Sequence, residues 1–323
     1  MMKNFAYVKA GSVAAAIKAL GTKGAILHAG GTDLLGCVRD ETFPVEKIVS
    51  ISGLKELKGI SARPDGGLKI GALTTVAEVA STASIAEKYA VLAQAAAEVA
   101  SPQLRNQGTI GGNICQRPRC WYYRGDFPCA RKAGDMCYAV DGENQYHAIF
   151  GGGPCFFVHP SDTAVALVAL QAQLLIAGPA GSKAVKIENF FVGPDKDIKK
   201  ENILLPNEIV TEIHLPPISG NVRSSYRKIR ARRAWDFALT SVGVVLQYEN
   251  DSVNRARIVL GGVGPYPWRV EAAEKLLIGK KIDSTLAASA GQAAAEGANP
   301  LRDNAYKIQV VQGAVEESLL ALA

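Results

Sequence analysis

The sequence has no long apolar run and no block of like charge. Nowhere in its 323 residues do about 20 consecutive apolar side chains follow one another, the length that a bilayer-spanning helix needs. The basic residues, 36 against 30 acidic, are not gathered in a tail or stripe, so the net charge of +6 gives little support for nucleic-acid binding. We therefore expect no membrane span and no nucleic-acid partner.

The N-terminus also lacks the apolar core of a secretion signal, because Phe5, Ala6 and Tyr7 run directly into a strand-like segment. Six cysteines without such a signal favour a reducing compartment over a disulfide framework. By its own sequence the chain is expected in the cytoplasm. It would reach the periplasm only if a partner subunit with an export signal carried it there folded.

Catalytic motifs are scarce. The chain has four histidines, no carboxylate pair in a recognisable acid–base arrangement and no Gly-x-Ser-x-Gly motif. No Gly-x-Gly-x-x-Gly follows a strand, so the dinucleotide-binding pattern of a Rossmann unit is missing. We identify no catalytic residue, and the pattern favours a redox carrier over a complete substrate-transforming enzyme.

What the sequence does contain is a concentration of cysteine. Four of the six cysteines lie in one segment without helical or strand period, separated by eight, seven and seventeen residues: Cys120, Cys129, Cys137 and Cys155. Structural zinc sites usually hold two thiolates at C-x2-4-C spacing, which only Cys115 and Cys120 approach. Four singly presented thiolates suit a cubane iron–sulfur cluster better, with zinc and disulfides as the alternatives. Cys37 and Cys115 are expected to be free buried thiols.

The residues around these cysteines are positively charged. From Gln116 to Lys132 one anion, Asp126, stands against five cations: Arg117, Arg119, Arg124, Arg131 and Lys132. A four-thiolate cubane is negatively charged, so nearby cations would stabilise it and favour its reduced form. The aromatic residues at 121–123 either shield such a cluster from water or simply pack the loop.

Two glycine turns are the second feature. The first, at residues 29–33, follows a buried strand, and the second spans residues 108–113. Paired glycines let a ligand approach the backbone and leave N–H groups free as an anion nest, for which a diphosphate is a natural guest. One such turn alone is more often a plain strand-to-helix turn. Two together favour a long phosphate-bearing ligand held between two subdomains.

The order of elements predicts an α+β protein of two domains. The first, residues 1–217, divides into a small α/β unit at about 1–57 and a second subdomain at 58–217, closed by the pair Pro216-Pro217. The second subdomain holds a hairpin at 59–73, alanine-rich helices over about 75–100, the cysteine insertion at about 115–156, regular structure again from Phe156 to Val158, and a helix capped by Ser161.

Residues 218–323 form the second predicted domain, a three-stranded sheet followed by helices. We expect strands near 224–230, 238–248 and 255–263, and helices near 269–278, 284–296 and 303–321. Two charged residues, one in each predicted domain, have open roles. Asp162 is either a favourable first-turn anion of its helix or a partner of a cofactor. Lys228 is either a solvated charge or a donor to a reduced flavin.

These motifs, in this order, resemble the FAD-binding medium subunits of the molybdenum hydroxylases, the xanthine dehydrogenase and carbon monoxide dehydrogenase family. The resemblance rests on the segments 29–35, 109–113, 159–162 and 204–208 and covers nearly the full length. The cysteine insertion resembles the branch with an extra [4Fe-4S] cluster, which comprises periplasmic-type aldehyde oxidoreductases and 4-hydroxybenzoyl-CoA reductase. The short second gap is closer to the aldehyde-oxidising branch.

The resemblance implies a two-subdomain FAD-binding domain of the CO dehydrogenase flavoprotein and vanillyl-alcohol-oxidase-like type, with a C-terminal domain of the CO dehydrogenase flavoprotein kind. It also implies a set of FAD-binding residues: Leu27, His28, Ala29, Gly30, Gly31, Thr32, Asp33, Leu34, Leu35, Ser101, Gln107, Thr109, Gly111, Gly112, Asn113, Asp162, Leu205 and Lys228. The two turns would hold the diphosphate, and Lys228 would lie near the isoalloxazine. The cluster ligands would be Cys120, Cys129, Cys137 and Cys155.

The resemblance further implies two partner subunits and an electron acceptor. A large subunit would carry the molybdenum cofactor, a small one [2Fe-2S] clusters, and the chain would pass electrons to an external acceptor, most simply during aldehyde oxidation. A complex of the 4-hydroxybenzoyl-CoA reductase or xanthine dehydrogenase type is the alternative. Two further interpretations stay open, a stand-alone FAD oxidase and a cluster-bearing structural or sensing subunit without flavin.

Overall fold

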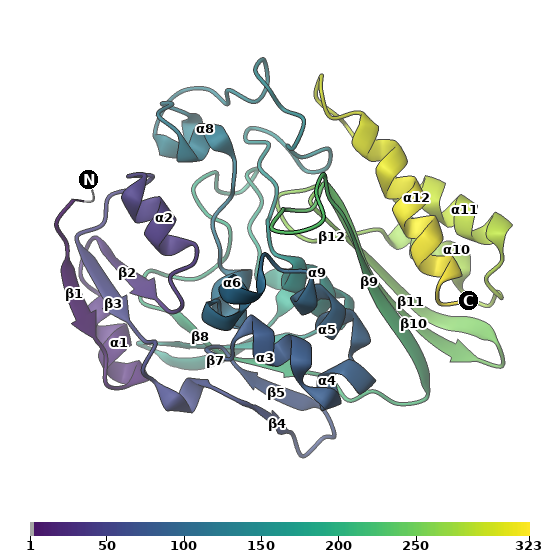
Figure 1. The fold of residues 1–323 in the computed structure, drawn as a ribbon, viewed down its shortest axis with the longest axis horizontal. Coiled ribbons are helices and arrows are strands. Elements are labelled where there is room, and N and C mark those ends of the chain that lie inside the picture. The colour runs from purple at the N-terminus through teal and green to yellow at the C-terminus, as the bar shows by residue number, and fades with distance from the viewer. Residues whose placement is uncertain (1–2) are drawn as a thin grey trace.

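A computed structural model describes residues 3–323 of the chain. Three sheets form its framework, with strand orders β1-β3-β2, β4-β5-β8-β6-β7 and β12-β11-β10-β9. Helices and a long irregular segment fill the space between and around them (Figure 1). Within residues 3–323, the helices are all too short or too polar to cross a membrane.

The first sheet is a small parallel α/β unit, as predicted. The central strand β3 pairs in parallel with both neighbours, and β1 is connected to β2 through a helix, as parallel strands require. Ser12 begins that helix, because its Oγ accepts the backbone N–H of Ala15 at 3.1 Å. The elements are β1 (Ala6–Lys9), α1 (Val13–Leu20), β2 (Ala25–His28), α2 (Leu34–Arg39) and β3 (Lys47–Ser50).

The second sheet is antiparallel and five-stranded, and the predicted hairpin forms its β4–β5 edge. Its strands are β4 (Ile60–Ala62), β5 (Leu68–Gly71), β6 (Gln173–Gly178), β7 (Gly181–Lys186) and β8 (Ile209–Leu215). The predicted alanine-rich helices are confirmed as α3 (Val76–Ser81), α4 (Ala83–Lys88) and α5 (Ala90–Ala97). Three short 3-10 turns lie at 55–57, 130–132 and 187–189.

The helix α9 (Asp162–Ala169) forms the centre of the molecule, because each of its residues is buried. The predicted cap is present, since Ser161 Oγ accepts the N–H of Ala164 at 3.0 Å. Just before it, Phe156 to Val158 form no strand, against expectation. Their backbone bonds with loops instead, as where Ala148 donates to the carbonyl of Phe156 at 2.8 Å.

The cysteine insertion has little regular structure, as its sequence predicts. It follows α6 (Pro102–Gln107) and α7 (Ile110–Ile114) and contains one short helix, α8 (Trp121–Arg124). In Figure 1 its loops lie above the sheets, between α2 on one side and the start of α12 on the other. The insertion therefore reaches both the first α/β unit and the C-terminal helices.

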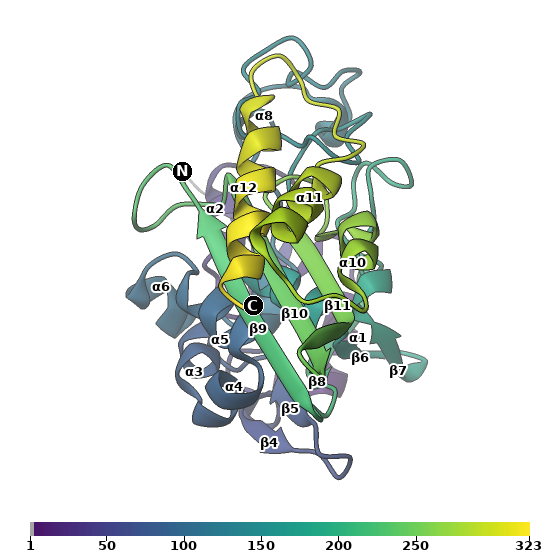
Figure 2. The same ribbon diagram turned by 90° about the vertical axis from the view of Figure 1, so that its right-hand side faces the viewer.

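The third sheet contains the three predicted strands, and a short fourth strand of two residues is added at one edge. The strands are β9 (Asn221–Ile229), β10 (Thr240–Glu249), β11 (Ser252–Gly261) and β12 (Trp268–Arg269), and the helices are α10 (Glu271–Leu277), α11 (Ser284–Ala294) and α12 (Tyr306–Leu320). Figure 2 shows these helices covering one face of the sheet. The other face meets α5 and α9, where Gly243 leaves room for Val91 and Val165.

Candidate cofactor site

A deep cleft lies where the first α/β unit, the second subdomain and the β9–β10 loop meet. Its cavity of about 840 Å³ is within the size range of small-molecule sites in proteins. Both glycine turns line it, as do the residues before α9 and the segment 199–206. The lining includes cations from several elements: Arg117, Arg119, Lys199, Lys200, Lys228 and Arg232.

The two glycine turns pack directly on each other. A Cβ at Gly30 would lie 2.0 Å from the carbonyl oxygen of Gln107, so only glycine fits there. Gly31 adopts a positive φ of 74°, and Gln107 Nε2 donates to the Gly30 carbonyl at 3.2 Å. The cleft wall therefore includes two backbone segments held in contact.

The two turns differ in the N–H groups that they leave free. Within residues 3–323, the backbone N–H groups at positions 30–33 donate to no protein acceptor. In the second turn, Ile110 donates to Thr74, Gly111 to Ala72 and Gly112 to the Thr109 hydroxyl. Only the first turn therefore offers a run of unpaired donors to an anion.

Asn113 ties the second turn to the start of α9. Its Oδ1 accepts the hydroxyls of Ser161 and Thr163, each at 2.6 Å. This amide oxygen is thereby occupied by protein donors, although Asn113 itself lines the cleft. Its main effect is to fix the distance between the second turn and Asp162.

Asp162 and Lys228 form a buried ion pair at the inner end of the cleft. Lys228 Nζ lies 2.7 Å from Asp162 Oδ2, and Tyr226 donates its hydroxyl to Asp162 Oδ1 at 2.6 Å. Burial raises the pKa of the Asp162 carboxyl, while the Lys228 charge and the Tyr226 hydroxyl oppose that shift. Asp162 is therefore more than a first-turn anion, and Lys228 is not a solvated charge.

Four of the residues implied by the resemblance do not line the cleft. His28 contacts Ser50 Oγ at 3.3 Å through Nδ1, and Ser101 caps α6 by accepting the N–H of Leu104. Gln107 supports Gly30 from behind, and the half-exposed Leu35 lies next to Gly31. The others all line it: Leu27, Ala29, Gly30, Gly31, Thr32, Asp33, Leu34, Thr109, Gly111, Gly112, Asn113, Asp162, Leu205 and Lys228.

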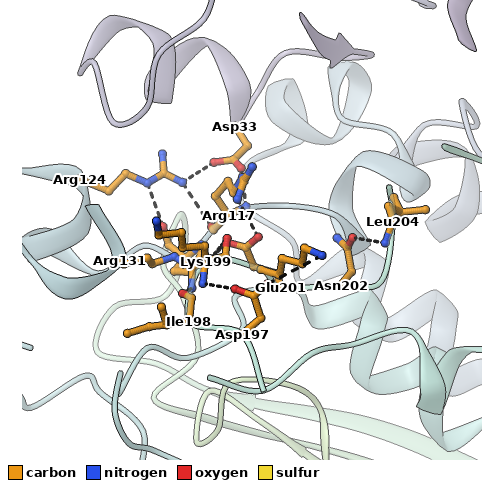
Figure 3. Close-up of polar contacts among 12 residues, drawn as sticks. Asp33, Arg117, Arg124, Arg131, Asp197, Ile198, Lys199, Glu201, Asn202 and Leu204 are labelled. Atoms are coloured by element: carbon orange, nitrogen blue, oxygen red, sulfur yellow. Dashed lines mark hydrogen bonds and ion pairs between the residues drawn. The ribbon is translucent and has the colours of Figure 1, made fainter. Parts of the chain in front are cut away.

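Sequence reasoning did not find the ionic network between the first turn and the insertion. The carboxylate of Asp33 accepts the backbone N–H of Arg117 at 2.7 Å and pairs with Arg124 at 2.6 Å (Figure 3). It also pairs with Arg119 at 3.0 Å. These arginines were expected to neutralise a cluster. The only signal in the sequence was an acidic residue in one glycine turn and excess basic charge elsewhere.

Glu201 forms the second half of this network. It pairs with Arg117 through Oε2 at 2.9 Å and with Arg131 through Oε1 (Figure 3). Arg131 also donates to the carbonyl of Ile198 at 2.6 Å, and its guanidinium stacks over Phe157. Arg131 and Glu201 are both buried, so the insertion is clamped to a segment that lines the cleft.

The four predicted cluster cysteines are free thiols that lie in one chain of contacts. An isolated β-bridge pairs the backbone of Cys129 with that of Met136, which precedes Cys137. A hydrogen bond from the neighbouring Cys155 thiol lowers the pKa of Cys137. The bond between Ala148 and Phe156 brings residue 155 close to His147, whose Nε2 lies 3.3 Å from Cys120 Sγ. Burial raises the pKa of the Cys120 thiol to about 11, and the negative charge of the nearby Cys137 and Cys129 thiolates adds to that rise.

No single-ion site is formed by this arrangement. Throughout residues 3–323, no three or more His, Cys, Asp or Glu side chains converge as a metal ion would require. Cys37 and Cys115 are both free thiols, as expected, but only Cys37 is fully buried, because Cys115 lines the cleft. Burial raises the pKa of Cys115 to about 12, and its charged neighbours are Glu201 and Arg117.

Comparison with known proteins identifies the family. Residues 3–218 match the family described as the FAD binding domain in molybdopterin dehydrogenase, and residues 224–322 match the CO dehydrogenase flavoprotein C-terminal domain. The chain belongs to the FAD-binding medium subunits of the molybdenum hydroxylases. This medium subunit is thus the flavin-binding subunit of an oxidoreductase complex, and the fold class implied by the sequence resemblance is correct.

Relatives align with this medium subunit over nearly its whole length. The aldehyde oxidoreductase FAD-binding subunit PaoB of Escherichia coli (strain K12) is 36% identical over 95% of the chain and 94% of its own length. The glyceraldehyde dehydrogenase medium chain of Sulfolobus acidocaldarius is 28% identical over the same shares. A structure of carbon monoxide dehydrogenase from Hydrogenophaga pseudoflava matches with a TM-score of 0.80 and 27% identity, covering 100% of this chain and 98% of that one.

The cleft fits the FAD that the family binds. It offers the unpaired N–H donors of the first turn for phosphate, apolar walls that include Leu73, Val99 and Leu104, and the Asp162–Lys228 pair at its inner end. The residues present are therefore compatible with a bound dinucleotide such as FAD.

Proposed function

We propose that this medium subunit carries both FAD and a [4Fe-4S] cluster and transfers electrons within an aldehyde-oxidising molybdenum hydroxylase. The observation that carries the proposal is the double role of the segment 115–131. Its arginines 117 and 119 line the FAD cleft, while Cys120 and Cys129 belong to the chain of four thiols. Two redox sites in one subunit, joined by one short segment, suit an electron relay.

The residues that hold FAD follow from the donors in the cleft. The N–H groups at positions 30–33 would bind the diphosphate, because within residues 3–323 they form the run of consecutive unpaired donors that the second turn lacks. Gln107 and Ser101 would act indirectly, by supporting the turn and α6. FAD, when bound, accepts and delivers electrons singly or in pairs.

The Asp162–Lys228 pair would act on the ring of the cofactor. Lys228 is fixed by Asp162 and by the Glu98 carbonyl at 3.1 Å, so its charge has little freedom to move away. A fixed cation beside the ring would favour electron uptake. Tyr226 holds the other carboxylate oxygen and so keeps Asp162 oriented toward Lys228.

The cluster ligands are proposed to be Cys120, Cys129, Cys137 and Cys155. Each iron of a cubane takes its own thiolate, so the sulfurs stand further apart than the ligands of one ion. Residues 3–323 contain no group of three or more His, Cys, Asp or Glu side chains that would hold one ion, so the preference for a cubane over structural zinc rests on the single presentation of the four cysteines in the sequence. Arg131, buried beside them, adds a stabilising positive charge at Cys155.

The partners are proposed from the family. A large subunit with the molybdenum cofactor would oxidise the substrate, and a small subunit with [2Fe-2S] clusters would relay electrons to FAD and on to an external acceptor. Aldehydes are the favoured substrates, because two relatives are named for aldehyde substrates. Xanthine-type and 4-hydroxybenzoyl-CoA reductase-type complexes are the alternatives, while the family match disfavours a stand-alone FAD oxidase. The compartment, cytoplasmic or periplasmic with an exported partner, stays a prediction.

The test is anaerobic reduction of the assembled complex, purified through this subunit. An aromatic or aliphatic aldehyde should bleach the flavin absorbance, whereas xanthine should not. Bleaching by xanthine alone would contradict the aldehyde assignment. Purification of the chain with flavin but without any molybdenum-containing partner would contradict its place in such a complex.

A further inference from the structure

A buried histidine contacts one of the four cysteines. The imidazole of His147 is 4% exposed, and its Nε2 lies 3.3 Å from Sγ of Cys120. The other ring nitrogen, Nδ1, is buried and finds no hydrogen-bond partner within residues 3–323. This side chain is neither a proposed cluster ligand nor part of the FAD cleft.

The surroundings determine which ring nitrogen donates. A neutral imidazole has one N–H, and a sulfur that ligates iron has no proton to donate. With the proton on Nδ1, the ring would turn the Nε2 lone pair toward an electron-rich sulfur that can only accept. A doubly protonated ring would also carry a proton on Nε2. In each favourable state, therefore, the Nε2–H of His147 donates to Cys120 Sγ.

The C-terminal domain fixes the histidine in place. The carbonyl of His147 accepts from Asn304 Nδ2 and from Lys307 Nζ, both at 3.1 Å, and both of these side chains are fully buried. Lys307 also donates to the carbonyl of Gly262 at 2.8 Å, which ties the insertion to the third sheet. On its other side, the imidazole meets the edge of Trp121 with 5.6 Å between ring centroids.

We propose that His147 raises the reduction potential of the cluster by donating its Nε2–H to the Cys120 sulfur, an inference that rests on the proposed [4Fe-4S] cluster. Reduction adds negative charge to the cluster and its sulfurs. A hydrogen bond to a ligating sulfur therefore stabilises the reduced form more than the oxidised form. His147 is a positioning residue: it acts through Cys120 and binds no iron.

The test compares two substitutions of His147 in the full-length chain with FAD bound. His147→Gln keeps an N–H donor of similar reach, whereas His147→Met fills the space without a donor. Tyr122→Phe is the matched control, because it removes a hydrogen bond from the same segment, to the Glu143 carbonyl at 3.1 Å, but none to sulfur. Iron per chain and the cluster midpoint potential, followed by electron paramagnetic resonance, are the readouts.

We expect all three variants to keep their iron. The midpoint potential should become more negative in His147→Met, stay near the wild-type value in His147→Gln and be unchanged in Tyr122→Phe. An unmoved potential in His147→Met, or an equal shift in Tyr122→Phe, would overturn the inference. Loss of iron from both His147 variants would also overturn it, because His147 would then be a ligand or a folding requirement.

A second measurement needs no variant. In wild-type protein labelled with ¹⁵N-histidine, the reduced cluster should couple magnetically to a histidine nitrogen, because His147 Nε2 contacts Cys120 Sγ. Absence of that coupling from a cluster-containing sample would overturn the inference by itself. Absence of iron from the wild-type chain would instead defeat the cluster proposal, so the two failures are distinguishable.

Discussion

Gly30 is required by what it touches. Its Cα faces the carbonyl of Gln107, at a position where a side chain would overlap the backbone of the second turn. The neighbouring N–H groups stay free because the turn leaves β2 without entering another ladder. At the scale of single residues, therefore, close packing of two backbones and the supply of anion-binding donors have the same cause.

Gly30→Ala should greatly lower the amount of FAD that the purified chain retains. The added methyl group would lie 2.0 Å from the Gln107 oxygen, so one turn must move and the donors at positions 30–33 would lose their alignment. Gly11→Ala is the matched control, because nothing lies within 4 Å of its Cβ position. Flavin absorbance per chain after gel filtration is the measurement. Equal flavin content in both variants would contradict the proposed role of the first turn.

Because His159 is buried, we expect the free energy of unfolding to decrease at acidic pH. Burial lowers its pKa from 6.5 to about 4, so the folded state disfavours the proton that the unfolded chain takes up. The neutral ring stabilises the fold fully above pH 6.5, and that stability is lost as the pH falls toward 4. By pH 5 the loss from this one group would reach about 2 kcal/mol.

His159→Phe should therefore flatten the acid side of the stability profile. Phenylalanine keeps the edge contact with Phe191, whose ring centroid lies 4.9 Å away, and cannot be protonated. Urea unfolding at pH 7.5 and at pH 5 gives the free energy of unfolding at each pH. We expect the drop between them to be smaller in the variant by roughly 2 kcal/mol. An equal drop in both proteins would show that His159 titrates normally.

At the scale of elements, the insertion is held by side chains because its backbone forms so little regular structure. Its one short helix and one 3-10 turn cannot fix the positions of four thiols alone. Asp33 and Glu201 hold its arginines from two different elements, α2's start and the 197–204 segment. Lys307 and Asn304 hold its end from the C-terminal domain. The cysteine positions thus depend on all three parts of the molecule.

Glu201→Gln should loosen the insertion and lower iron content. The change leaves the buried Arg131 without its carboxylate, and breaking a buried ion pair typically costs about 3–5 kcal/mol. Glu317→Gln is the control, since it removes an exposed pair with Arg227, for which less than about 1 kcal/mol is expected. Thermal unfolding and iron per chain are the measurements. Equal effects of the two changes would mean that the Glu201 clamp is not what holds the insertion.

At the scale of the whole molecule, local sequence signals predicted the elements well and their contacts poorly. The strand expected near 238–248 is Thr240–Glu249, and the hairpin, the capped helix α9 and the three terminal helices all form. Their signals, alternation, capping residues and helical period, are local in the chain. The two-residue strand β12 has no such signal. Phe156 to Val158 form no regular structure, because their backbone groups bond with loop residues instead.

The candidate site was predicted only where a motif marks it. The glycine turns were identified from their own pattern, the resemblance assigned cofactor roles to Asp162 and Lys228, and all of them line one cleft. The three arginine partners of Asp33, by contrast, lie from 84 to 91 residues further along the chain, and nothing local links them. The His147–Cys120 contact likewise depends on how the insertion folds back. Long-range pairs of charged or polar side chains became visible only with the structure.

The most direct test of the two-cofactor subunit is the flavin and metal content of the purified chain and of its six single Cys→Ser variants. We predict one FAD and about four irons per wild-type chain. Iron should be lost in the variants at Cys120, Cys129, Cys137 and Cys155. It should be kept in those at Cys37, which lies outside the cluster segment, and at Cys115, which lies in the cleft wall. Stoichiometric zinc without iron, or iron that survives all six substitutions, would contradict the account.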